Sequence, residues 1–320
     1  MKHKSVFKNE AIEFLNLKEN KIYLDLTLGS GGHSLEILHK LGSVKLFAFD
    51  LDQRNIDEVA NLLKDKGFKE EGAGNVHRLS RDKKEVVLIN DNFTKLGEYL
   101  RKAGVDKVDG ILADLGWSSD QLDSIPGLSY ENLYDELDMR LSTALGVKAS
   151  DLLNALSRKE LSEMFARYSD IKGNQNEKLV SAIVSFRKKN LFEKVDDLLN
   201  VVDQASRGSQ FRRFGNENKN SNYSKVFQAL RIAVNNEMQN LEEMLNEGYR
   251  VLAKNGRFAV ITFHSGEERV VNGFFKNLIA KKEAQFVSNQ YGEVYTRPSV
   301  EELTENLRSR SAKLWVIEKL

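Results

Sequence analysis

A glycine-rich segment near the amino terminus has the residue types of a loop that binds a nucleotide-like ligand. It reads Asp25-Leu-Thr-Leu-Gly-Ser-Gly-Gly-His33 and follows a short apolar run. Glycines at such a strand-to-helix junction let the backbone turn tightly and approach a ligand closely. The segment is not a dinucleotide fingerprint, because Ser34 stands where the third glycine of G-x-G-x-x-G is expected. A tight turn that binds no ligand is the alternative interpretation.

Two aspartates beside this glycine loop indicate which ligand it suits. Asp50 follows the loop at about the distance at which an acidic residue of nucleotide-binding folds accepts hydrogen bonds from both ribose hydroxyls. Asp25 precedes the glycines, where its charge would repel a pyrophosphate and attract a sulfonium and an ammonium group. This charge pattern favours S-adenosylmethionine over NAD. Phe93 could cover the adenine ring with an aromatic face, although it also suits the core.

A second polar segment could serve the methyl-transfer reaction itself. Asp114 lies at the carboxyl end of the fourth predicted strand, beside the expected methyl donor. An aromatic amine is a poor nucleophile because its lone pair is delocalised into the ring, so an acceptor that holds the NH2 hydrogens helps the nitrogen to pyramidalise. Asp114 is the candidate for orienting the amine. A structural cap of the following turn is the alternative.

The sequence contains no pattern typical of a metal site or a thiol nucleophile. Cysteine is absent, which excludes disulfides, thiolate catalysis and cysteine-based zinc sites. His33, His39 and His264 have no metal-ligand spacing and are interpreted as structural. Methyl transfer from a cationic sulfur is an in-line displacement that positioning and electrostatics can accelerate without a metal.

The composition is that of an ordinary folded protein. Of the 320 residues, 41% are hydrophobic and 30% are charged, and the net charge is +1. Any affinity for nucleic acid must therefore come from basic residues gathered on one face. No window approaches eighteen consecutive apolar residues, and no apolar run follows the first lysines. We expect a cytoplasmic protein that does not span a membrane.

The candidate residues follow apolar runs that alternate with helical stretches, which is the pattern of a doubly wound, mostly parallel α/β sheet. The carboxyl ends of parallel strands meet at the ligand-binding edge, so Asp25, Asp50 and Asp114 are expected there together. The predicted strands are Ile22–Leu26, Val44–Phe49, Val86–Ile89, Val108–Ala113, Arg257–Phe263 and Ala312–Glu318.

A helical insertion interrupts this pattern. Helical periodicity predicts helices over Ala149–Tyr168, Asn176–Lys189 and Val195–Ala205. The polar stretch Arg207–Asn222 predicts a loop, and a long amphipathic helix is expected over Ser224–Ala253, before a turn at residues 254–256. The expected domains are residues 1–116 and 223–320 for the core, and residues 117–222 for the insertion.

Several separated motifs together resemble those of the RsmH (MraW) family of ribosomal RNA methyltransferases, over nearly the whole chain. Each motif is weak alone, whereas their order and number are specific. They are Tyr23-Leu-Asp-Leu-Thr-Leu-Gly-Ser-Gly-Gly-His-Ser34, Asp50-Leu-Asp52, Asp109-Gly-Ile-Leu-Ala-Asp-Leu-Gly-Trp-Ser-Ser-Asp-Gln-Leu-Asp123, Leu137-Asp-Met-Arg140, Phe227-Gln-Ala-Leu-Arg-Ile-Ala-Val-Asn235, Phe263-His-Ser265 with Glu267 and Arg269, and Arg308-Ser-Arg-Ser-Ala-Lys313.

The resemblance implies a Rossmann-like class I methyltransferase core with an inserted helical domain that meets RNA. It implies S-adenosylmethionine as cofactor, and N4 methylation of a cytidine in the decoding region of small-subunit ribosomal RNA. The partner would be that RNA or the assembling small subunit, and the protein a monomer or weak homodimer. Carried over position by position, the cofactor contacts would be Gly31, Gly32, His33, Asp50, Phe93, Asp114 and Gln121.

Departures from the family pattern fall mainly outside the glycine loop. The family's Pro-Val-Leu-Leu near the amino terminus appears as Ser5-Val-Phe-Lys8, its Gly-Glu-Glu as Ser169-Asp-Ile171, and its Arg-Gly-Phe-Ser-Phe within Ile125–Tyr130. The methyl donor is therefore more firmly implied than the target nucleotide.

Basic and aromatic residues of these motifs are candidates for RNA contacts, although each also suits a solvated or core position. A reachable amine requires a single-stranded or splayed-out cytidine. Arg231 and Asn235, one helical turn apart, could reach one side of their helix. The candidates for phosphate contacts are Arg140, Arg212, Arg213, Arg231, Arg308 and Arg310, and those for base stacking are Trp117, Tyr130 and Phe214.

Three alternatives remain. Phe263–Arg269 would lie beside the acceptor pocket, or would be a plain connection capped by Ser265. A methyltransferase acting on DNA amines is disfavoured, because Asp114-Leu-Gly-Trp117 has leucine and glycine where two prolines are expected between the acid and the aromatic residue. An RNA-binding assembly factor that keeps the fold without transfer would not bind S-adenosylmethionine in the micromolar range, about −8 kcal/mol.

Overall fold

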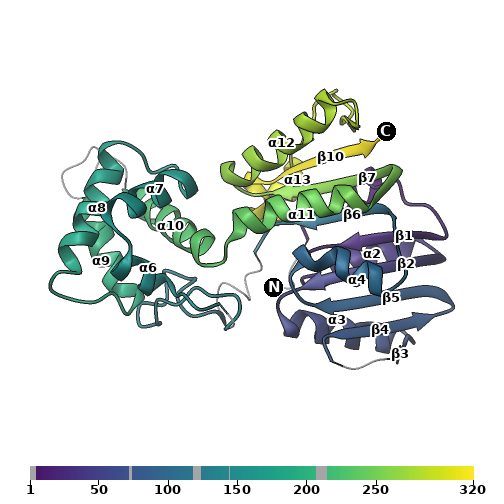
Figure 1. Cartoon of the computed structure of the whole chain (residues 1–320), viewed down its shortest axis with the longest axis horizontal. Coiled ribbons are helices and arrows are strands. Elements are labelled where there is room, and N and C mark those ends of the chain that lie inside the picture. The colour runs from purple at the N-terminus through teal and green to yellow at the C-terminus, as the bar shows by residue number, and fades with distance from the viewer. Residues whose placement is uncertain (1–4, 72–73, 118–123, 144, 207–214) are drawn as a thin grey trace. The chain divides into compact units, whose positions relative to one another are not determined.

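The computed structural model describes residues 5–71, 74–117, 124–143, 145–206 and 215–320, with the backbone only at 215–221. The chain forms two compact units (Figure 1). We call residues 1–116 with 239–320 the sheet unit, and residues 117–238 the helical unit. The expected second boundary, after Asn222, is wrong because the helix Gly215–Val234 packs within the helical unit.

The sheet unit is built on one mixed sheet, which within the described residues has ten strands in the order β3-β4-β5-β2-β1-β6-β7-β10-β8, with β9 beside β10. Neighbouring strands are parallel from β5 to β7, and β10 is antiparallel to β7. The strands are β1 Lys21–Asp25, β2 Ser43–Asp50, β3 Lys69–Glu71, β4 Val76–Arg81, β5 Lys83–Asn90, β6 Val108–Asp114, β7 Leu252–Thr262, β8 Ala284–Phe286, β9 Tyr295–Thr296 and β10 Lys313–Lys319.

Helices cover both faces of this sheet. Successive strand residues point to opposite sides, and buried apolar side chains lie on both sides. In β1, Tyr23 packs with α1, α2 and α3, whereas Leu24 packs with α4, α11 and α12. The helices are α1 Lys8–Phe14, α2 Gly32–Lys40, α3 Gln53–Asp65, α4 Leu96–Lys102, α11 Glu237–Val251, α12 Ser265–Ala280 and α13 Val300–Glu305, with 3-10 turns η1 Phe93–Lys95 and η3 Leu307–Ser311. The expected doubly wound α/β fold is confirmed.

All six predicted strands are present, with ends displaced by a few residues. The antiparallel pair β3–β4 was not predicted, because only Leu79 of its residues is buried and no apolar run marks it. The expected turn at residues 254–256 lies inside β7. There Asn255 has φ 61°, and the pairing of β6 with β7 shifts register.

In its described residues, the helical unit packs helices α6 to α10 around its own apolar core (Figure 1). They are α6 Ala149–Ala155, α7 Arg158–Tyr168, α8 Asn174–Phe186, α9 Val195–Ser206 and α10 Gly215–Val234. The single helix expected over 149–168 is two helices. Leu156 is extended, and Ser157 starts α7 by accepting a hydrogen bond from the Glu160 backbone while the Glu160 carboxylate accepts one from the Ser157 amide.

Two further predictions, of a loop and of the long helix that follows it, are wrong in where the helices begin and end. Residues 215–222, expected in a loop, form the start of α10, while 207–214 lie outside the described residues. The long helix expected over 224–253 is divided into α10 and α11 at Asn235 and Asn236. Asn236 has φ 51°, a left-handed conformation that asparagine tolerates and a continuous helix excludes. Within the described residues, no helix is long and apolar enough to cross a membrane.

Candidate active site

The strand order reverses at β1, which lies between β2 and β6 in the sheet. The connections that leave β1 and β6 therefore diverge, and such a switch point at the carboxyl ends of the strands is where open α/β sheets bind ligands. Asp25 ends β1 and Asp114 ends β6, so both expected acids lie at this point. Asp50 ends β2 on the other side of β1.

The glycine loop forms the connection from β1 to α2, and two of its glycines lie in crowded positions. Gly31 precedes α2 with φ 80°, and a Cβ atom there would lie 2.8 Å from Val59 Cγ2. A Cβ atom on Gly32 would lie 2.0 Å from Ser5 Oγ. The backbone at the first turn of α2 therefore stays bare and open to close approach by a ligand.

Asp25 is 1% exposed and is bound by hydroxyl and backbone donors. Ser34 Oγ donates to its Oδ2 at 2.6 Å, and the Thr27 amide donates to its Oδ1 at 3.2 Å. Burial raises the pKa of Asp25 above its ordinary value, against the lowering effects of His33 and of these hydrogen bonds. The residue therefore holds a carboxylate in a place where a negative charge is poorly solvated.

Asp50 joins the end of β2 to the glycine loop. Its Oδ2 accepts hydrogen bonds from the Gly29 amide at 2.8 Å and from Asn55 Nδ2 at 3.0 Å, and its Oδ1 accepts one from the Asp52 amide at 2.8 Å. Desolvation by the surrounding atoms raises the pKa of Asp50 to about 6, although these hydrogen bonds act in the opposite direction. Asp50 thus fixes the loop as well as presenting a carboxylate at the sheet edge.

Asp114 is half-buried at the end of β6, next to the switch point. Its amide donates to Thr27 Oγ1 at 2.6 Å, and its Oδ1 accepts a hydrogen bond from the Gly116 amide at 2.9 Å. Desolvation raises the pKa of Asp114, Asp25 raises it further, and His33 and Arg308 lower it. The expected turn-capping role is present, because Asp114 binds the Gly116 amide.

None of these three carboxylates has a lysine or arginine nitrogen within 4 Å among the described residues. Elsewhere in the chain, largely buried carboxylates such as Asp138 and Glu237 are paired with arginines. A carboxylate removed from water without a positive partner is unfavourable. The three acids of the sheet edge therefore suit a ligand that carries positive charge.

The other predicted cofactor contacts lie around the same edge, with one outside the described residues. His33 is 4% exposed, and its Nε2 donates to the Val6 carbonyl oxygen at 3.1 Å, so that ring nitrogen is already used. Phe93 starts η1 just past β5 and is half-buried against the core. Gln121 lies outside the described residues.

The connection from β7 to α12 lies next to Asp114, because β7 pairs with β6. A Cβ atom on Gly116 would lie 2.7 Å from the Phe263 ring. The capping residue of α12 is His264 and not Ser265. Its Nδ1 accepts hydrogen bonds from the Gly266 and Glu267 amides at 3.2 and 3.4 Å. Glu267 Oε2 accepts one from the Phe263 amide at 2.7 Å. The expected capping by Ser265 is therefore wrong, and a place beside an acceptor pocket stays a prediction.

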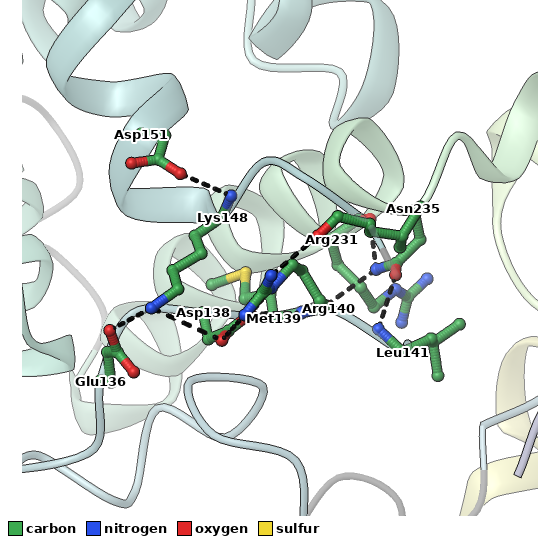
Figure 2. Close-up of polar contacts among 10 residues, drawn as sticks. Glu136, Asp138, Met139, Arg140, Leu141, Lys148, Asp151, Arg231 and Asn235 are labelled. Atoms are coloured by element: carbon green, nitrogen blue, oxygen red, sulfur yellow. Dashed lines mark hydrogen bonds and ion pairs between the residues drawn. The ribbon is translucent and has the colours of Figure 1, made fainter. Parts of the chain in front are cut away.

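Two motifs of the helical unit meet in an internal polar network. Figure 2 shows Asn235 beside the backbone of Met139 and Leu141. Asn235 Oδ1 accepts from the Leu141 amide at 2.8 Å, and its Nδ2 donates to the Met139 carbonyl oxygen at 2.9 Å. Met139 is buried with φ 64°. Asn235 therefore stabilises a left-handed turn and does not reach out as a ligand contact.

Two arginines that were candidates for phosphate contacts are paired inside this unit. Arg140 binds both oxygens of Asp138, at 2.6 and 2.8 Å (Figure 2). Arg231 binds both oxygens of Glu237, at 2.8 and 3.1 Å, and lies 4.6 Å from the Trp117 ring centroid. Tyr130 packs against Tyr223 and Phe227. Arg212, Arg213 and Phe214 lie outside the described residues.

Sequence reasoning missed two residues of the site. Thr27 links Asp25 to Asp114, and Ser34 donates to Asp25. Both are in the segment that the glycine motif marks, where their hydroxyl groups close to Asp25 in the sequence were an available signal. The described residues contain no group of three or more histidine, aspartate or glutamate side chains that could hold a metal.

The class of protein follows from the fold and the site. A mixed, mostly parallel sheet has a glycine loop at its switch point and acids at three strand ends, which is the arrangement of a Rossmann-like methyltransferase. The model of the MraW methylase family matches residues 1–320, and the chain belongs to that family.

Relatives match the chain over its whole length. Ribosomal RNA small subunit methyltransferase H of Mycoplasmopsis agalactiae is 35% identical, over 100% of this chain and 99% of the relative. Ribosomal RNA small subunit methyltransferase H 1 of Acholeplasma laidlawii is 36% identical over the same shares. The solved structure of an rRNA methylase from Streptococcus thermophilus covers 100% of this chain and 99% of its own, with 11% identity and a TM-score of 0.43. At that TM-score the likeness bears on neither cofactor nor substrate.

Proposed function

We propose that this chain transfers a methyl group from S-adenosylmethionine to the exocyclic N4 of a cytidine in the decoding region of small-subunit ribosomal RNA. The observation that carries the proposal is the set of three carboxylates at the carboxyl edge of the sheet with no lysine or arginine partner within 4 Å among the described residues. Membership of the MraW methylase family and the names of the relatives support the reaction and the RNA.

The residues at this edge fit the cofactor. S-adenosylmethionine, when bound, supplies a methyl group on a cationic sulfur together with an ammonium group. Asp50 would accept a hydrogen bond from a ribose hydroxyl at Oδ1, which has one donor at present, whereas Oδ2 already has two. The bare backbone at Gly31 and Gly32 would admit the amino-acid end of the cofactor, and Phe93 would lie against the adenine. Gln121 stays a proposed contact.

Asp114 would bind the amine hydrogens of the target base. Its position at the end of β6 places a carboxylate beside the switch point, and the Gly116 hydrogen bond fixes its orientation. Positive charge nearby favours the ionised form of a carboxylate whose pKa is otherwise raised by desolvation. Asp114 would therefore be an acceptor once the donor is present. An acceptor on the NH2 hydrogens directs the nitrogen lone pair out of the ring plane.

The substrate would be the small-subunit RNA or the assembling subunit, presented as a single-stranded or splayed-out cytidine. The helical unit would contribute to RNA recognition. We place the reaction in the cytoplasm and expect a monomer or a weak homodimer.

Mass-spectrometric mapping of modified nucleosides in small-subunit RNA tests the proposal, in cells with and without this gene. One N4-methylated cytidine in the decoding region should disappear with the gene. It should return with the wild-type chain and stay absent with Asp114→Asn at equal protein level. Identical nucleoside maps with and without the gene would refute the proposal.

A further inference from the structure

The 3-10 turn η3 lies at the same edge of the sheet as the candidate active site. It ends at Ser311, and β10 begins at Lys313, which pairs with Thr262 at the carboxyl end of β7. Ser309 is 0% exposed, and its Oγ donates to the Asn306 carbonyl oxygen at 2.7 Å. The turn is therefore closed by its own hydrogen bond, and its continuation into β10 places it beside the carboxyl end of β7.

The residues of η3 divide between an inner and an outer face. Arg308 is half-buried, and its charge is close enough to lower the pKa of Asp114. Leu307 is 71% exposed, and Arg310 is exposed. In a 3-10 helix, side chains three positions apart eclipse one another, so Leu307 and Arg310 share one face. An exposed leucine and an exposed guanidinium thus lie on one face, one and two residues away from Arg308, whose charge lowers the pKa of Asp114.

Arg310 has no carboxylate oxygen within 4 Å in the part of the chain that the structure describes. This separates it from Arg140 and Arg231, whose guanidinium groups are bound by Asp138 and Glu237. An arginine that is neither paired nor packed can bind phosphate without first losing an internal partner.

We propose that Leu307 and Arg310 form a contact surface for the single-stranded RNA next to the target cytidine. Arg310 binds a backbone phosphate, and Leu307 covers the adjoining sugar or base. When the target base is splayed out, its neighbouring nucleotides lie at the rim of the acceptor site. Each carries an anionic phosphate beside a sugar and a base, which match a cation beside an apolar side chain. This inference rests on the proposed function, and it names the part of the sheet unit that holds the flanking RNA.

Binding and turnover measurements on the full chain test this surface. The variants are Arg310→Ala, Arg310→Glu and Leu307→Ala, and the RNA probe is a transcript of small-subunit ribosomal RNA. Arg101→Ala is the matched control, because Arg101 is an exposed arginine at the end of α4, before β6 begins, and hence at the opposite edge of the sheet. Calorimetry with S-adenosylmethionine and thermal unfolding are measured for every variant.

We expect Arg310→Ala to weaken RNA binding several-fold and Arg310→Glu to weaken it further. The slope of log affinity against log salt should fall by about 0.7 for one lost phosphate contact on a single strand. Leu307→Ala should raise the KM for RNA without changing the salt slope. Cofactor affinity and unfolding temperature should match the wild type, as should all values for Arg101→Ala.

Wild-type RNA affinity and salt slope in Arg310→Glu would overturn the inference. So would a loss confined to intact small subunits with transcript binding unchanged, because that result would assign the surface to a ribosomal protein. Failure of the wild-type chain to bind S-adenosylmethionine is a different result, and it would refute the proposed function itself.

Discussion

The carboxylates of the two units have different partners. In the sheet unit, backbone amides and neutral side chains donate hydrogen bonds to Asp25, Asp50 and Asp114. In the helical unit, an arginine binds both oxygens of Asp138, and another binds both oxygens of Glu237. Burial raises the pKa of the three carboxyl groups in the sheet unit. Hydrogen bonds from Arg140 help to lower the pKa of Asp138 in the helical unit. The same side-chain chemistry therefore leaves carboxylates without an arginine or lysine partner in the described part of one unit and forms internal ion pairs in the other.

The difference shows how to separate a site from a structural network. A paired and hydrogen-bonded charge has satisfied its main interactions within the chain, and removing one partner weakens the fold. A partly or fully buried carboxylate that has only neutral donors has no opposite charge beside it, so a positively charged ligand can still pair with it. Substitutions at the sheet edge should therefore affect binding and transfer more than folding, and those in the helical network should do the reverse.

The largest expected effect is at Asp114. We expect Asp114→Ala to lower methyl transfer by about a hundredfold or more, the scale of a positioned catalytic group, with a much smaller change in unfolding. Asp114→Asn is the matched variant, because its amide oxygen can still accept the Gly116 hydrogen bond. Single-turnover assays with bound cofactor measure transfer. Equal losses of transfer and folding in both variants would make Asp114 structural.

A smaller effect of the opposite kind is expected at Asn235, which is 4% exposed. Asn235→Ala leaves the Leu141 amide and the Met139 carbonyl without this partner, so the helical unit should lose about 2 kcal/mol of unfolding free energy. Trp117 fluorescence in a Trp315→Phe background follows this unit during denaturation. Cofactor affinity should stay unchanged. Asn246→Ala, on the exposed side of α11, is the control, and an equal effect there would remove the special role of Asn235.

Asp50→Ala should weaken S-adenosylmethionine binding by roughly 1 to 3 kcal/mol, the scale of lost charge-assisted hydrogen bonds. Part of the loss would come from the glycine loop, because the Gly29 amide also loses its acceptor. Calorimetry measures the affinity, with the exposed Asp57→Ala on α3 as control. An affinity equal to the wild type would exclude Asp50 from the ribose site.

The smallest effect concerns pH and the stability of the ligand-free protein. Because the pKa of Asp50 is raised to about 6, the folded state binds its proton more tightly than the unfolded state does. Its contribution to stability is therefore fully present below the unfolded pKa and is lost as the pH rises to about 6. Asp50→Asn removes this titration, so the stability of the variant relative to the wild type should rise by on the order of 1 kcal/mol between pH 4 and pH 7. A difference independent of pH would contradict this.

The sequence predicted the parallel strands and the three acids at their ends, because buried strands appear as apolar runs and their ends can be located directly. It did not predict the helix breaks at Leu156 and Asn236, since each depends on one residue within an otherwise helical pattern. The pairing of Arg231 with Glu237 was also missed, because the approach of their side chains depends on the break between α10 and α11.

The capping of α12 by His264 was missed for another reason. Histidine is not among the residues that usually begin helices, and Ser265 beside it has the usual chemistry. Such choices depend on side-chain geometry around the junction, which a linear pattern does not contain.

A crystal structure of the chain grown with S-adenosylhomocysteine tests the central claim most directly. The ribose should lie against Asp50, the amino-acid end beside Asp25 and the backbone of Gly31 and Gly32, and the sulfur next to Asp114. An empty glycine loop, or a ligand bound only in the helical unit, would contradict the account.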